Sequence, residues 1–151
     1  MSIERIDRFD ADAEEAGRLA SPLYGDHVIA AANYLNWRYV DAPHAYRCFG
    51  AGSEGYAVVR RMRERGLETG MICTVIAATA RVTRALLARC ADELRGVQLL
   101  AALRPPAHQA AWLAAGFVPS QRTMAPLGKP LRAGISLPPA PALQFGDYDF
   151  V

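Results

Sequence analysis

The chain has few of the features that mark exported, membrane-spanning or metal-binding proteins. None of its uncharged runs reaches the roughly 20 predominantly apolar residues that cross a bilayer, and Met1–Arg5 lacks the apolar core of a signal peptide. Cysteine is scarce: Cys48, Cys73 and Cys90 form no CxxC pair and have no metal-ligand spacing. We therefore expect a cytoplasmic protein with reduced thiols, no bound metal and no membrane partner.

The chain also has little net charge. Its 17 basic residues, of which only Lys129 is a lysine, face 15 acidic residues, so the formal net charge is +2. This near balance argues against a nucleic-acid partner, because such partners select strongly basic surfaces. The densest basic run, Arg60–Arg65, is interpreted as a solvated strand end or turn.

What the chain does have is enough apolar sequence for one folded unit. With 151 residues, of which 52% are hydrophobic and 21% charged, it can bury a core and does not have a disordered composition. We expect a single domain over residues 1–151. Four of the ten prolines fall in Pro130–Pro141, which predicts an irregular connection there.

The first part of the chain predicts a weak strand, two helices and a hairpin. Charges alternate with apolar residues in Ser2–Phe9, and Asp10 can cap a helix that Pro22 and Gly25 should break. An apolar stripe at helical spacing, with the asparagines elsewhere, predicts a second helix after Asp26. The predicted bounds are Ala11–Leu19 for the first helix, an end at Asp41–Pro43 for the second, and hairpin strands Tyr46–Gly50 and Tyr56–Arg61 around a glycine-rich turn.

The second part predicts alternating strands and helices. Leu67–Ala77 is continuously apolar after its first residues, which is typical of a strand covered on both faces. Thr79 or Thr83 can start the next helix, which Gly96 ends. The remaining predicted elements are a buried strand Val97–Leu103, a helix Ala107–Ala115 ended by Gly116, and strands within Phe117–Leu127 and Leu143–Phe145. This order predicts an α/β (α+β) fold: a mixed, mostly antiparallel sheet flanked by helices on both faces.

Several short segments carry a family resemblance. Ala114-Ala115-Gly116-Phe117 is similar to the helix-ending x-x-G-F of the GNAT N-acetyltransferases, and the element order fits that family over most of the chain. The segments Tyr34–Tyr39, with Pro43 and Tyr46, and Phe145–Asp149 resemble an uncharacterised bacterial subgroup of GNAT-like proteins. The resemblance implies acyl transfer from acetyl-CoA, or another acyl-CoA, to a small-molecule or peptide amine by direct attack.

The resemblance also implies a cofactor site around the start of the third predicted helix. The family holds the pyrophosphate on amides of a glycine-rich helix start, whereas Ala77–Thr83 contains no glycine. The matching positions would contact pantetheine through the backbone of Ile76, Ala77 and Ala78. The pyrophosphate would lie on Ala80, Arg81, Val82 and Thr83, and Arg81 and Arg84 would supply positive charge. The alternative is that both arginines are solvated residues at a helix start.

The acid that protonates the leaving thiolate is not supplied at its family position. Trp112 occupies the place of the usual tyrosine, and an indole N–H is no proton donor at physiological pH. Pro105 occupies the place of an asparagine that is common near the start of the last helix. Tyr148, Tyr34 and Cys73 are candidate substitutes, and the sequence does not select among them.

The base that accepts the amine proton has three candidates. Glu68, which enters the central strand, matches the family position best, followed by Glu64 and then His108. Glu68 can instead be a strand-edge charge, and His108 an exposed polar residue. The carboxylates Asp147 and Asp149 share one face of an extended chain and could bind a cationic amine or a metal, or they are simply solvated.

Two function classes therefore follow. The first is an acyl-CoA-dependent N-acyltransferase. The second is a catalytically degenerate GNAT-like binding or regulatory module that pairs with another domain or forms a homodimer. The aromatic group around Trp37 lines a substrate pocket in the first case and packs in a core or an interface in either.

Overall fold

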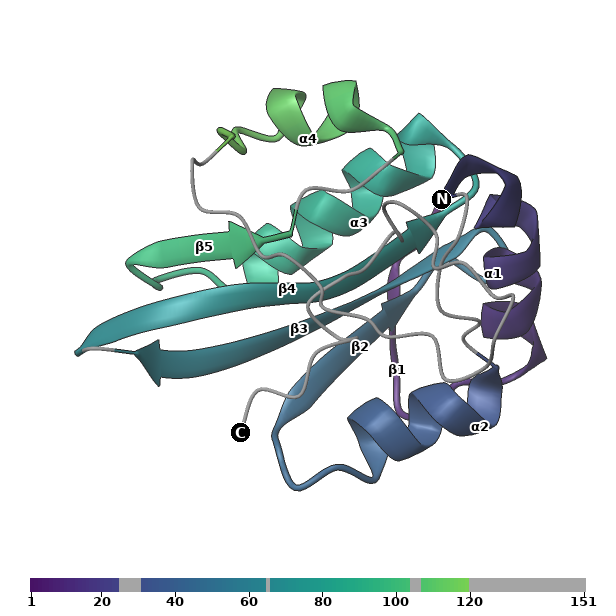
Figure 1. The fold of residues 1–151 in the computed structure, drawn as a ribbon, viewed down its shortest axis with the longest axis horizontal. Coiled ribbons are helices and arrows are strands. Elements are labelled where there is room, and N and C mark those ends of the chain that lie inside the picture. The colour runs from purple at the N-terminus through teal and green to yellow at the C-terminus, as the bar shows by residue number, and fades with distance from the viewer. Residues whose placement is uncertain (25–30, 65, 104–106, 120–151) are drawn as a thin grey trace, which may run out of the picture.

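The computed structural model of this chain contains a five-stranded sheet with helices on both faces (Figure 1). The structure describes residues 1–24, 31–64, 66–103 and 107–119. In chain order the elements are β1 (Glu4–Ile6), α1 (Ala11–Tyr24), α2 (Ala32–Leu35), the π-helix η1 (Asn36–Val40), β2 (Tyr46–Gly50), β3 (Gly55–Glu64), β4 (Leu67–Ala77), α3 (Ala80–Glu93), β5 (Leu99–Ala102) and α4 (Gln109–Ala114).

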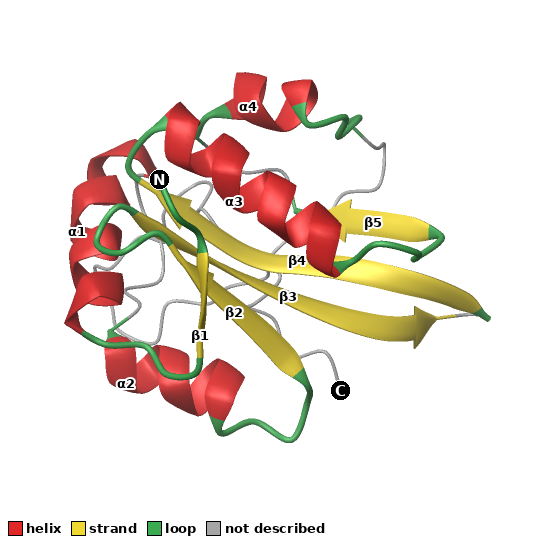
Figure 2. Ribbon diagram, turned by 180° about the vertical axis from the view of Figure 1, so that it is seen from behind, coloured by secondary structure: helices red, strands yellow, loops and turns green. Residues whose placement is uncertain are grey.

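The strands lie in chain order across the sheet, β1-β2-β3-β4-β5. Neighbouring strands from β1 to β4 are antiparallel, while β4 and β5 are parallel and joined through α3 (Figure 2). The predicted mixed, mostly antiparallel sheet is therefore confirmed. The parallel pair requires a crossover, because a tight turn can only join antiparallel neighbours.

Each face of the sheet has its own core. The α1 face combines the buried side of α1 with Leu35, Tyr39 and the inward residues of β2–β4, while the α3 face combines α3 and Trp112 with the opposite residues of the same strands. Since both faces are covered, most of β4 is buried, as its apolar run predicts. The buried face of α3 contains Val82, Leu86, Leu87, Cys90 and Leu94, as its spacing predicts, but Ala91 is exposed and not part of it.

A β-bulge interrupts β4 at its centre. Val58 of β3 pairs with Thr74 and the next residue, Val59, pairs with Ile72, so Cys73 is an extra residue without a partner position. Met71 and Cys73 pack into the α1-face core, and Ile72 packs into the α3-face core. The bulge therefore changes the direction of the strand immediately before its last residues.

Two predicted boundaries are wrong for identifiable reasons. Helix α1 does not stop at Leu19 but continues through Pro22 to Tyr24. Its buried stripe of Ala13, Ala16, Ala20 and Tyr24 packs on the sheet, and this contact outweighs the missing amide of one proline in the last turn. Strand β5 is shorter than the predicted Val97–Leu103. It is also not a buried strand, since Leu99 is half exposed and its other residues are partly buried.

The asparagine expected on the outer side of the second helix is buried. The Asn36 side chain accepts a hydrogen bond from the Phe9 amide at 2.8 Å and donates one to the Phe9 carbonyl at 2.9 Å. It lies at the start of η1, where the wider π-helical turn places Asn36 and Tyr39 together in the interior. The side chain thereby ties the segment after β1 to this helix.

Some predictions concern residues outside the described ranges. These are Asp26 before the second helix, the connection Pro130–Pro141, the strand Leu143–Phe145 and most of the strand predicted in Phe117–Leu127. Phe117–Pro119 are described and form no strand. Within the described ranges, no helix combines the length and apolar character needed to cross a bilayer.

Candidate functional site at the terminal edge of β4

The last residues of β4 extend beyond the end of β5, the parallel strand next to it. The ladder with β5 ends at Ile72 opposite Ala102, and the Cys73 bulge follows at once. The backbone groups of Val75 and Ala77 that point away from β3 therefore lie past the end of β5. We call this stretch the terminal edge of β4.

The direction of these groups follows from one hydrogen bond. The Ala78 amide donates to the Glu54 carbonyl at 3.0 Å, so the backbone of Ala78 faces the β3 side. Because neighbouring residues of a strand direct their N–H and C=O groups to opposite sides, Ala77 and Val75 face the other way, toward the terminal edge.

Helix α3 begins directly beyond this edge. Thr79, one of the two predicted starts, is its N-cap, and the Thr79 hydroxyl accepts a hydrogen bond from the Val82 amide at 3.3 Å. The Thr79 carbonyl accepts from the Thr83 amide at 3.0 Å and from its hydroxyl at 3.1 Å. Val82 and Thr83 thus point into the core, and the helix itself uses their amides. The amides of Ala80 and Arg81 belong to the first turn, where no preceding helical carbonyl can accept them.

The two predicted phosphate-binding arginines are exposed at this helix start. A guanidinium nitrogen of Arg81 lies 3.7 Å from a carboxylate oxygen of Glu54, in a pair that is largely solvated. Arg84 is exposed one turn further along α3. The structure thus brings Ile76, Ala77, Ala78, Ala80 and both arginines to one end of the sheet.

Glu68 does not join this group. It lies near the beginning of β4, exposed and 3.9 Å from the Arg63 guanidinium. At about 3.3 Å per residue, five strand residues separate Glu68 from the bulge by roughly 17 Å. The side chain of Glu64 and the residues Tyr148, Asp147 and Asp149 lie outside the described part of the structure.

The aromatic and thiol candidates Trp112, Trp37 and Cys73 differ in how deeply they are buried. Trp112 is buried on the α3 face and packs edge-on against Phe117, with ring centroids 5.0 Å apart. Trp37 is largely exposed and lies 5.9 Å from the Tyr34 ring. Burial raises the pKa of the Cys73 thiol to about 12, which keeps it protonated at neutral pH.

The sequence did not single out Tyr24, which lies on the terminal edge. Its hydroxyl donates to the Val75 carbonyl at 3.1 Å, and the Ala77 backbone lies close enough to the same oxygen to act on its pKa. Burial raises the pKa of Tyr24 to about 12, although the Ala77 contact opposes this shift. The alanine stripe of α1, at helical spacing with Tyr24, is the signal that places this side chain on the sheet.

His108, the third-ranked base in the sequence analysis, lies on the same edge. Its Nε2 atom is 3.3 Å from the Ala77 carbonyl oxygen. His108 has φ 55° and ψ 34°, and it is the one non-glycine residue with positive φ among the described residues. Such left-handed backbone at a side chain with a specific contact often marks a functional site.

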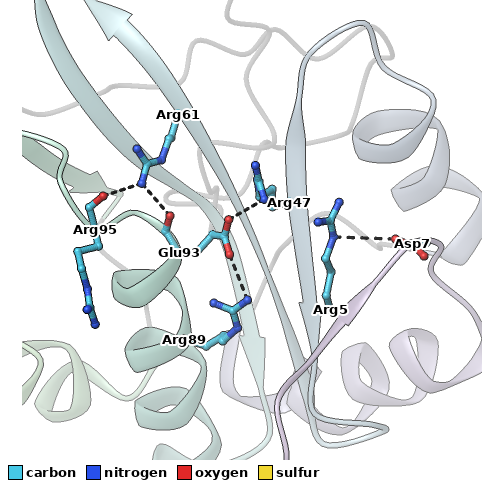
Figure 3. Close-up of polar contacts among 7 residues, drawn as sticks. All are labelled: Arg5, Asp7, Arg47, Arg61, Arg89, Glu93 and Arg95. Atoms are coloured by element: carbon cyan, nitrogen blue, oxygen red, sulfur yellow. Dashed lines mark hydrogen bonds and ion pairs between the residues drawn. The ribbon is translucent and has the colours of Figure 1, made fainter.

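In the described part of the run Arg60–Arg65, two arginines contact other parts of the same chain. The Arg60 guanidinium lies 5.7 Å from the centre of the Tyr46 ring. Arg61 donates to the carbonyls of Glu93 and Arg95 at the end of α3, at 3.0 and 2.6 Å (Figure 3). Arg60 and Arg61 therefore both make contacts within the protein.

Outside the terminal edge, the described residues offer few other candidate sites. They contain no group of three histidine, cysteine or acidic side chains that could hold a metal ion. A separate cleft of about 200 Å³ lies between β1, η1 and the start of β2, lined by Arg5, Tyr39, His44 and Tyr46 among others. Tyr39 belongs to the aromatic group around Trp37 that was considered for a substrate pocket, whereas the predicted cofactor-binding residues and Glu68 are not part of the lining.

Comparison with known proteins supports the fold and not the activity. No family model matches the sequence, and no curated protein of similar sequence was found. Among solved structures, an isoleucine-to-methionine mutant of TTHA1254 from Thermus thermophilus is similar at a TM-score of 0.56 and 18% identity, covering 87% of this chain and 100% of the other. The wild-type TTHA1254 structure matches at a TM-score of 0.49 and 18% identity, covering 91% and 100%. At this identity the first likeness shows a common fold alone.

Proposed function

We propose that this protein is a GNAT-type N-acyltransferase that uses acetyl-CoA, or another acyl-CoA, to acylate a small-molecule or peptide amine. The observation that carries the proposal is the terminal edge of β4, which leads from the Cys73 bulge to the start of α3. A pantetheine chain is extended and contains amides, so it can lie along such an edge as a short strand does. The end of the edge at a helix start suits an anionic pyrophosphate.

In this arrangement the phosphates lie on the first-turn amides of Ala80 and Arg81, with the Arg81 and Arg84 guanidinium groups beside them. A guanidinium group can donate two parallel hydrogen bonds to phosphate oxygens. The amine nitrogen attacks the thioester carbonyl directly and forms the C–N bond of the amide, the C–S bond breaks, and the proton that the nitrogen loses is balanced by one gained by the leaving sulfur, so that the products are the amide and the CoA thiol. Since Glu68 is roughly 17 Å from the bulge along the strand, it can act as the base only through intervening waters or substrate groups.

A second candidate function is a GNAT-like binding or regulatory module without catalysis. Three observations favour it: Trp112 is a buried core residue, the amides of Val82 and Thr83 bond to Thr79, and side chains of the chain itself occupy the terminal edge. Such a module would have the fold of an acyltransferase and bind acyl-CoA weakly or not at all.

Titration with acetyl-CoA separates the two functions. We expect calorimetry to detect binding and thermal unfolding to shift upward, since a ligand at 100 times its Kd stabilises a fold by about 2.7 kcal/mol. Replacing Arg81 and Arg84 by alanine should weaken binding at least tenfold, as expected for the loss of about 1.5 kcal/mol or more of charge-assisted hydrogen bonding. The exposed pair Arg18 and Arg95, replaced in the same way, serves as the control.

The outcomes distinguish the candidates as follows. Binding together with CoA-thiol release in the presence of a panel of primary amines supports the transferase. Binding without thiol release supports the non-catalytic module. If millimolar acetyl-CoA produces neither heat nor a thermal shift, the proposed acyl-CoA site is wrong.

A further inference from the structure

Side chains of the same chain already lie against backbone groups of the terminal edge. Four groups point toward this edge, the amide and carbonyl of Val75 and the amide and carbonyl of Ala77, and side chains from α1 and from the residue before α4 lie against the last three. In a parallel pair, a residue of the neighbouring strand would bond to the first carbonyl and to the amide two positions later. Here β5 ends at Ala102, opposite Ile72, and does not supply that residue.

Tyr24 takes the place of the missing strand residue. Its hydroxyl donates to the Val75 carbonyl at 3.1 Å. The Ala77 backbone lies close enough to the same oxygen to lower the pKa of Tyr24, which is the effect of an N–H group that faces a phenolic oxygen. One hydroxyl thus lies against the two backbone groups that the N–H and C=O of one residue of a neighbouring strand would bond.

His108 covers the third group. Its Nε2 atom is 3.3 Å from the Ala77 carbonyl, and the bond forms in the tautomer that has its proton on Nε2. The side chain reaches this position from a left-handed backbone conformation that costs free energy for a residue with a Cβ atom. Tyr24 reaches the edge from the last turn of α1, and His108 reaches it from the residue directly before α4.

We propose that Tyr24 and His108 form an autoinhibitory contact that closes the terminal edge and that acyl-CoA must displace in order to bind. This inference rests on the proposed function, and it adds the regulation of the same site. The pantetheine amides and the two side chains compete for the same three backbone groups. Binding therefore breaks the Tyr24 and His108 hydrogen bonds, and the affinity for acyl-CoA is lower than an unoccupied edge would give.

The contact can be tested by removing its polar atoms one at a time. Tyr24→Phe keeps the buried ring and deletes the hydroxyl, and His108→Gly deletes the ring at a position where glycine tolerates the left-handed backbone. In calorimetric titrations with acetyl-CoA, we expect each variant to bind about fivefold more tightly than the wild type, which corresponds to about 1 kcal/mol. Tyr46→Phe at the start of β2 and His44→Ala two residues before it, both away from the edge, should leave the Kd unchanged.

Amide hydrogen exchange gives a second measurement that needs no ligand. Exchange at Ala77 should accelerate in Tyr24→Phe and remain at the wild-type rate in Tyr46→Phe. If the four variants and the wild type bind acetyl-CoA with the same Kd within twofold, the closure is refuted and the binding site stands. Weaker binding by Tyr24→Phe and His108→Gly also refutes it, because the two side chains would then help to hold the ligand. If neither the wild type nor any variant binds, the proposed function fails and the closure fails with it.

Discussion

Gly55 occupies the tightest place at the junction of β3, β4 and α3. A Cβ atom at this position would lie 2.7 Å from the Ile76 carbonyl oxygen and 2.9 Å from a methyl carbon of Val82. Neither neighbour can move freely, since the first is backbone and the second is fully buried. Gly55 therefore sets how closely the start of α3 approaches the end of β4, which is the geometry on which the candidate site depends.

Gly55→Ala should destabilise the fold by about 2 kcal/mol or more, because overpacking a rigid core forces the backbone to shift. The matched control is Gly17→Ala within α1, where a Cβ atom would meet nothing within 4 Å. That substitution should stabilise the protein by about 0.5–1 kcal/mol, since alanine is the better helix former. Urea unfolding measures both, and equal stabilities of the two variants would contradict the packing argument.

At this scale the sequence predicts residues whose role is local. Thr79 precedes a helical stripe and is the N-cap it was expected to be. The roles of Tyr24 and Asn36 depend on partners 51 and 27 residues away, so local patterns cannot predict their hydrogen bonds. The phosphate-binding and base roles of Arg81, Arg84 and Glu68 remain predictions, although the structure separates Glu68 from the two arginines.

At the scale of elements, a strand residue completes the end of a helix. Arg61 of β3 donates to two carbonyls at the C-terminal end of α3, at 3.0 and 2.6 Å, while Glu93 lies between the guanidinium groups of Arg47 and Arg89 (Figure 3). The last carbonyls of a helix lack helical partners and carry partial negative charge, so a cation there stabilises them. These contacts fasten the far end of α3 to the sheet.

Arg61→Met should therefore lower the free energy of unfolding by about 1–2 kcal/mol, since it keeps the aliphatic part of the side chain and removes the donors. Arg63→Met, two positions along the same strand, removes only a solvated pair with Glu68 at 3.9 Å and should change stability by less than about 0.5 kcal/mol. Chemical unfolding of both variants measures the difference. A loss of equal size in both would show that the helix end does not depend on Arg61.

The elements themselves were predictable wherever hydrophobic period and turn signals agree. The β2–β3 hairpin, β4 and α3 follow their patterns closely. Helix α1 was predicted too short because the proline rule is local, whereas the packing of Tyr24 on β4 is not. The bulge at Cys73 has no sequence signal: within a continuously apolar strand, one additional residue leaves the pattern unchanged.

On the scale of the whole molecule, burial has consequences beyond packing. Cys48, Cys73 and Cys90 lie in the core as free thiols, and burial raises the pKa of each to about 12 from an ordinary value of 9.0. Burial raises the pKa of Tyr24 to about 12 from 10.0 in the same way. In the unfolded chain all four groups regain water and titrate near their ordinary values. Above about pH 9 the folded state therefore holds more protons than the unfolded state.

Because the folded pKa values are raised, these groups stabilise the fold fully below pH 9 and lose that contribution as the pH rises toward 12. Each group contributes a slope of up to about 1.4 kcal/mol per pH unit in that interval. We expect the free energy of unfolding, measured by urea titration between pH 7.5 and 10.5, to be level at first and then to fall steeply above about pH 9. Cys90→Ala should reduce the slope by about one proton, whatever it does to stability at pH 7.5, and Tyr24→Phe should reduce it further above pH 10. A free energy of unfolding that stays level to pH 10.5 would mean that these thiols are hydrated in the folded protein, which would contradict a closed core on both faces of the sheet.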